Sequence, residues 1–142
     1  MADLGEAVRG YLTANAGVLA LTSTRIYPDV LPQGYTVTTG GALTYTIIDT
    51  IHDHALNGLL GIARSRIEFA SFAGTRAAAN AIAEAVRASG LQGKTGLVGG
   101  VFFESVMIDS GVQTLDERPT DGTQQHRYIT VFDYLIAYQE SI

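Results

Sequence analysis

The closing apolar stretch of the chain, residues 126–138, constrains the fold most, because its side chains require cover on two faces. Alternate residues of an extended strand point to opposite sides of a sheet. One side of this strand then carries Ile129, Val131 and Leu135. The opposite side carries mostly aromatic residues: Tyr128, Phe132, Tyr134, Ile136 and Tyr138. A helix can cover one face, and a neighbouring subunit can cover the other.

Residues 43–51 are dense in threonine, isoleucine and tyrosine, and this composition predicts a half-buried strand. Simple alternation sets Tyr45, Ile47 and Ile51 on one face and the threonines on the other. The pair Asn57-Gly58 is typical of a turn that leads the chain back into a neighbouring strand. We therefore expect an antiparallel hairpin with a long tip, whose second strand runs through residues 66–69.

Two segments have the three- and four-residue apolar spacing of an amphipathic helix. The first lies close to the N-terminus and carries Leu4, Ala7, Val8, Tyr11 and Leu12. The second, residues 74–89, is rich in alanine and is the clearest helix in the sequence. Gly90 follows it, where a left-handed C-terminal cap is expected.

The segments between these elements predict little regular structure. Residues 18–21 form a short second apolar turn, and residues 25–27 are expected to be extended. Pro28 and Pro32 bracket a segment that can be neither a regular helix nor a central strand, because proline lacks a backbone donor. Residues 92–100 are a glycine-rich connector.

Residues 101–108 add a further strand, so the predicted order is helix, strand, strand, helix, strand, strand. This order favours an α+β domain with a mostly antiparallel four-stranded sheet, on which the N-terminal helix and the long alanine-rich helix pack. The 142 residues are 46% hydrophobic and only 16% charged, which predicts a folded chain. We interpret residues 1–142 as a single domain.

Charge and cysteine content exclude several classes of function. The net charge is −5, and the nine lysines and arginines are scattered, so no basic surface for nucleic acid is expected. The absence of cysteine excludes disulfide scaffolds and thiol catalysis. No secretory signal or apolar stretch of roughly 20 residues is present, so we expect synthesis in the cytoplasm and no membrane contact.

Two short motifs suggest ligand chemistry but do not meet its requirements. Gly93-Lys94-Thr95 resembles the end of a phosphate-binding loop, yet Ala88 occupies the position of the required first glycine. We therefore interpret the segment as a connector with an exposed lysine. His52, Asp53 and His54 could ligate a metal, but we interpret them as a polar strand end, because His126 is the only other imidazole and no acidic cluster is evident beside it in the sequence. No cofactor and no metal are expected.

Catalytic groups are not evident either. The acidic residues are Glu104, Asp109, Asp116, Glu117 and Asp121. They are more simply a solvated acidic region than a pair of catalytic carboxylates. No Gly-x-Ser-x-Gly elbow is present to activate a serine. The aromatics of the last strand lie in acidic surroundings, which favours core or subunit-interface packing over base stacking. The sequence therefore predicts no enzyme.

Several short motifs, taken in order, resemble one known family across roughly the whole chain. They are Arg25-Ile26-Tyr27-Pro28 with Pro32-Gln33-Gly34, His54-Ala55-Leu56-Asn57-Gly58, Arg64-Ser65-Arg66-Ile67-Glu68-Phe69, Ala85-Val86-Arg87 and Arg127-Tyr128-Ile129-Thr130-Val131-Phe132-Asp133-Tyr134. This order resembles that of the small tail-completion and tail-terminator proteins of long-tailed, lambda-like bacteriophages. The chain departs from the family at residues 35–42, where it inserts threonines and glycines.

The resemblance implies a virion structural protein without catalysis or cofactor. Such a protein forms a homo-oligomeric ring, usually a hexamer, at the head-proximal end of the tail tube. The ring ends tube polymerisation and joins the tail to the head connector, and DNA passes through its lumen without specific binding. The candidate assembly residues are Asp116, Glu117, Arg118, Asp121, His54, Asn57, Tyr128 and Tyr134.

Two alternative functions stay open from the sequence. A head-completion protein of the neck has similar size and composition, and only the particle phenotype separates it from a tail terminator. A small α+β ligand-binding protein or enzyme would require a pocket with convergent polar groups.

Overall fold

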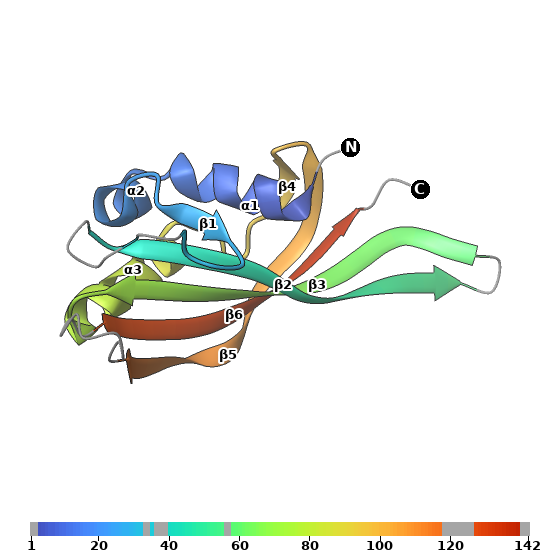
Figure 1. The fold of residues 1–142 in the computed structure, drawn as a ribbon. Helices are drawn as coiled ribbons and strands as arrows, with labels where there is room; N and C mark the ends of the chain where they lie inside the picture. The colour runs from blue at the N-terminus through green and yellow to red at the C-terminus, as the bar shows by residue number, and fades with distance from the viewer. Residues whose placement is uncertain (1–2, 33–34, 36–39, 56–57, 118–126, 140–142) are drawn as a thin grey trace.

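The computed structural model describes residues 3–32, 35, 40–55, 58–117 and 127–139, with the backbone alone for 53–55, 58–60 and 109–117. One curled sheet of six strands carries three helices on one of its faces (Figure 1). The elements in chain order are α1 (Leu4–Thr13), α2 (Ala16–Thr22), β1 (Ile26–Pro28), β2 (Ala42–Ala55), β3 (Gly58–Ala73), α3 (Arg76–Ala88), β4 (Gly96–Val98), β5 (Val101–Glu117) and β6 (Arg127–Gln139).

The strand order in the sheet is β1-β2-β3-β6-β5-β4. Strand β1 pairs with β2 in parallel, and every other pair is antiparallel. The last strand of the chain, β6, therefore lies inside the sheet, between β3 and β5. This position gives β6 a hydrogen-bonded neighbour strand along each of its edges.

The helices begin at side chains that cap their first turns. Asp3 accepts a hydrogen bond from the Gly5 amide, Asn15 from Val18, and Thr75 from Ala78. Helix α3 ends before Gly90, whose φ of +84° matches the left-handed cap expected there. The structure thus has an alanine-rich helix within residues 74–89, as the sequence predicts, but it spans only the 13 residues Arg76–Ala88.

The core lies between the helices and one face of the sheet. Strands β3 and β6 bury alternate residues on this face, including Ile67, Phe69, Phe132 and Tyr134, none of which is more than 1% exposed. The rings of Phe69 and Phe132 stack with centroids 5.3 Å apart, and Tyr134 meets Phe69 edge-on at 5.6 Å. The predicted division of β6 into two faces is confirmed.

The predicted four-stranded, mostly antiparallel sheet is wrong, because two short strands extend it into a mixed sheet of six. Strand β1 adds in parallel at one edge, and β4 forms inside the segment expected to be a glycine-rich connector. Each has only three residues, which is too short for an alternating pattern to be recognised. The segment after α1, expected to be a short apolar turn, forms the additional helix α2.

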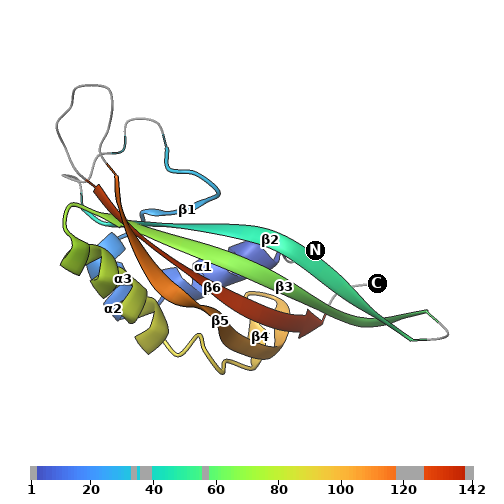
Figure 2. The same ribbon diagram turned by 90° about the horizontal axis from the view of Figure 1, so that it is seen from below.

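The β2–β3 hairpin is longer than predicted and extends beyond the helices as an arm (Figures 1 and 2). A register shift between Ile47 and Asp49 breaks the alternation of β2. Ile47 pairs with Ile67 on the core side of the sheet, whereas Ile51 pairs with Arg64 on the other side. The prediction that Ile47 and Ile51 share a face is therefore wrong.

Candidate assembly surfaces

The face of the sheet opposite the core is called the open face here, because the three helices pack on the other side (Figure 2). The register places Met107, Leu135 and Arg66 side by side across β5, β6 and β3 on this face. Leu135 is half-buried by its neighbours, whereas Met107 is 53% exposed. The open face is thus partly apolar and is covered by no helix among the described residues.

Strand β2 lies near one edge of the sheet and is covered over only part of its length. Strand β1 pairs with Leu43, Thr44 and Tyr45, and the Asp29 amide donates to the Tyr45 carbonyl at 2.9 Å. Within the part of the chain that the structure describes, no strand pairs with the outer side of residues 46–55. We call these ten residues the β2 free edge.

Strand β5 has a similar arrangement at the opposite edge. Strand β4 pairs with Val101, Phe102 and Phe103, and the Gly93 amide donates to the Val106 carbonyl at 2.8 Å. Among the described residues, no strand covers the outer side of residues 107–117. We call these eleven residues the β5 free edge. An unpaired edge presents N–H and C=O groups that can pair with another strand.

The β2 free edge exposes three isoleucines. Ile47, Ile48 and Ile51 are 39%, 50% and 54% exposed. Natural proteins commonly protect such edges with charged residues, above all lysine, or with proline. Residues 46–55 contain no lysine or proline, and their charged residues are Asp49 and Asp53. The sequence interpretation did not select these isoleucines, although the Ile47-Ile48 doublet is a signal, since it breaks strict alternation at the register shift.

Three of the eight assembly residues selected from the sequence lie at the C-terminal ends of β2 and β5. His54 lies in β2 opposite Leu59, and its side chain is outside the described part. Asp116 and Glu117 lie at the end of β5, opposite Tyr128 and Arg127, and only their backbone is described. Another three, Asn57, Arg118 and Asp121, lie outside the described residues.

The two tyrosines in that selection have different environments. Tyr128 is half-buried against the core, and the Arg76 guanidinium carbon lies 5.7 Å from the centre of its ring. Tyr134 is fully buried, and its hydroxyl has no hydrogen-bond partner among the residues that the structure describes. Burial raises the pKa of Tyr134 above its ordinary value, against a smaller opposing effect of Arg87. Tyr134 is therefore a core residue of the single chain.

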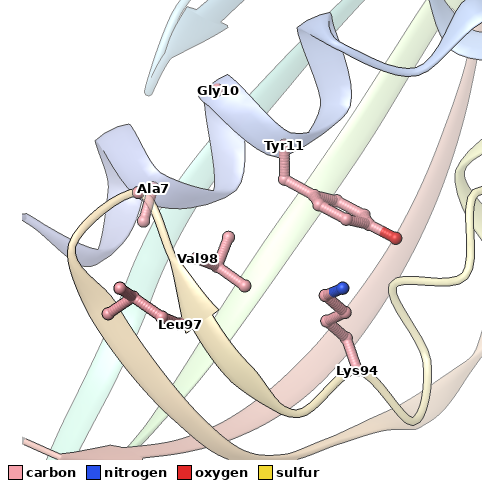
Figure 3. A pocket seen from close by; sticks show the side chains of 7 residues that line it. Ala7, Gly10, Tyr11, Lys94, Leu97 and Val98 are labelled. Atoms are coloured by element: carbon pink, nitrogen blue, oxygen red, sulfur yellow. The ribbon is translucent and has the colours of Figure 1, made fainter.

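A shallow pocket of about 410 Å³ lies between α1 and the β4 region (Figure 3). Its lining is Ala7, Gly10, Tyr11, Lys94, Leu97, Val98 and Gly99. The Tyr11 hydroxyl donates to the Ser89 carbonyl at 2.6 Å, and the Lys94 ammonium lies 5.6 Å from the centre of the Tyr11 ring. The polar groups of this pocket thus contact the protein itself rather than converging on a common point.

The Lys94 segment is a connector between α3 and β4, as the sequence predicted. Its Gly93 amide bonds to β5 rather than pointing into a loop that could hold a phosphate. Across the described residues, no three histidine, aspartate or glutamate side chains lie close enough to hold a metal ion. No helix in the same residues is long and apolar enough to cross a membrane.

No protein-family model matches this sequence, and no curated protein matches it. Among solved structures, the chain is similar to one from the virion of a native gene transfer agent (GTA) particle. The TM-score is 0.68 and the identity 20%, over 95% of this chain and 94% of the other. A second solved structure aligns with a TM-score of 0.48 at 18% identity, over 92% and 94% of the two chains. The first comparison establishes a shared fold over nearly the full length of both chains.

Proposed function

We propose that this protein is a structural subunit of a phage-like virion, and specifically a tail terminator or tail-completion subunit. The observation that carries the proposal is the fold that it shares, over nearly its whole length, with a chain of a gene transfer agent virion. The ordered resemblance to tail-completion proteins in the sequence supports the finer assignment. In this role, the subunits form a homo-oligomeric ring, a hexamer, at the head-proximal end of the tail tube.

The surfaces of the chain support an assembly role. A ring requires two different patches on each subunit, because every subunit contacts the next one head to tail. The sheet offers two candidate patches on opposite edges, the β2 free edge and the β5 free edge. Exposed apolar residues on these strands, such as Ile48, Ile51 and Met107, supply surface that is stabilised by burial against a partner.

The proposed partners are further copies of the chain, the tail tube protein and the head connector. The net charge of −5 disfavours tight contact with the DNA that passes through the lumen of such a ring. We propose no catalytic activity.

The test is electron microscopy of a lysate from a phage whose copy of this gene carries an early stop codon. We expect overlong or unattached tails beside filled heads, and restoration of normal particles by the intact gene supplied in trans. Free tails of normal length beside leaky or unjoinable heads would assign the protein to the neck instead. Normal infectious particles without the protein would contradict a structural role in the virion.

A further inference from the structure

The described parts of the two free edges have similar lengths and run in opposite directions. The β2 free edge has ten residues and the β5 free edge has eleven, so each spans about 35 Å at the usual rise of a strand. Three successive antiparallel pairs lead from β2 through β3 and β6 to β5. Strands β2 and β5 therefore run in opposite directions in one sheet. A β2 placed beside the β5 of another copy, with the same face up, is antiparallel to it.

We propose that the β2 free edge of one subunit pairs with the β5 free edge of the next, so that the sheet continues from copy to copy. This assignment of β5 as the partner edge rests on the proposed ring, because pairing of two β2 edges gives a closed dimer. The occupant of the β2 edge is thus a second copy of this chain, bound through backbone hydrogen bonds.

The covered parts of both strands permit this alignment. Strand β1 covers β2 just before residue 46, while β4 and Gly93 cover β5 up to Val106. When the two free edges lie antiparallel, β1 of one copy lies past residue 117 of the other. In the same alignment, the cover at Val106 lies past residue 55. Among the described residues, neither β1 nor the β4 and Gly93 segment therefore lies between the two backbones that pair.

The arm shape of the hairpin supports the same contact. The distal part of β2 and β3 extends away from the helices of its own chain, as both ribbon views show (Figures 1 and 2). Its isoleucines at positions 48 and 51 are half exposed in the single chain. Addition of a neighbouring strand shields these side chains and pairs the N–H and C=O groups of the edge.

Cross-linking tests the pairing directly, because the chain has no cysteine of its own. The test variant carries Ile51→Cys and Gln113→Cys, which lie near the middle of the two free edges. Ile51 pairs with Arg64 in β3, and Gln113 pairs with Val131 in β6. Within one chain, the two positions are three strand spacings apart, at least about 14 Å. A short bis-maleimide therefore links them only between copies.

The reaction is run on the concentrated purified chain and on particles that contain the variant. We expect a ladder of dimers, trimers and larger products on a denaturing gel from the double variant in at least one of the two samples. Each single variant should stay monomeric. The matched control pair is Ile51→Cys with Leu97→Cys, since Leu97 is 72% exposed but lies on β4, away from the β5 free edge.

Three results would overturn the proposal. They are dimers from Ile51→Cys alone at the yield of the double variant, an equal ladder from the control pair, and no ladder from the double variant in either sample. Failure of the proposed function gives a different result, namely absence of the chain from particles. A ladder from the purified chain would then still support edge pairing, independently of the virion.

Discussion

The two halves of β2 contain similar residues but have opposite environments. Leu43 and Tyr45, beside β1, are at most 4% exposed and belong to the core. Ile48 and Ile51, on the β2 free edge, are 50% and 54% exposed. The difference shows that strand composition does not reveal where burial occurs. The first half is buried by its own chain, and in our account the second half is buried by another copy.

Truncation of one side chain in each region tests whether the core and the β2 free edge contribute differently to stability. Phe69→Ala should lower the free energy of unfolding by about 3–5 kcal/mol, because it removes a fully buried ring that contacts Phe132 and Tyr134. Ile51→Ala should change it by only about 0.5 kcal/mol. Urea unfolding of the two variants checks the contrast, and an equally large loss from Ile51→Ala would show that the arm belongs to the core.

A smaller effect is expected where the β4 turn approaches α1. Gly99 has a φ of +54°, and a Cβ atom there would lie 2.9 Å from the Cα atom of Ala7. Gly99→Ala should therefore destabilise the fold by about 1–3 kcal/mol. The control is Gly93→Ala, which has a similarly positive φ of +81° but no atom within 4 Å of the added Cβ. Thermal unfolding should show the larger loss for Gly99→Ala, and equal losses would attribute the effect to backbone conformation alone.

The smallest expected effect concerns the buried hydroxyl of Tyr134. Tyr134→Phe removes an unpaired polar group from the core and should leave stability unchanged or raise it by about 1 kcal/mol at neutral pH. Because burial raises the pKa of Tyr134, the folded state binds this proton more tightly than the unfolded state. The protonated Tyr134 hydroxyl therefore makes its full contribution to the free energy of unfolding below the ordinary pKa of 10.0. This contribution is lost as pH rises through the pKa of the folded state.

Unfolding free energies measured from neutral pH to pH 11 check this sign. The fall above pH 10 should be shallower in Tyr134→Phe than in the wild type. Burial also raises the pKa of Tyr45, so Tyr45→Phe is the comparison for a tyrosine that does have a hydrogen-bond partner, the Glu6 carboxylate. A marked loss of stability from Tyr134→Phe at neutral pH would indicate that its hydroxyl has a partner.

The sequence predicts those parts of the fold that depend on local periodicity. The α1 and α3 helices and the four long strands all follow from apolar spacing and β-branched composition. The strand order could not be predicted, because insertion of β6 between β3 and β5 depends on contacts far apart in the sequence. The sequence predicts residues 25–27 as extended but not as a strand of the sheet, and it predicts the β4 residues as part of a connector, because three residues are too few to show alternation.

The candidate assembly surfaces could not be predicted from the sequence either, because they depend on the strand order. Whether Ile51 or Met107 is exposed depends on which strands lie at the edges of the sheet, and this is a property of the strand order. Tyr134 was selected as an interface residue for its aromatic ring, but this ring packs edge-on against both Phe69 and Phe132 and is buried in the core. Asp116 and Glu117 end β5, whereas Asp121 lies outside the described residues, and the role of these acidic residues in assembly stays a prediction.

We infer that the β2 free edge binds another subunit and contributes little to the stability of its own chain. The most direct test is to measure the length of tails made with the Ile51→Lys variant. A lysine at an edge strand opposes addition of another strand but should leave the fold intact, because Ile51 is exposed. We expect a folded variant protein with overlong or unattached tails, as in its absence. Tails of normal length on infectious particles that contain the variant would contradict the account.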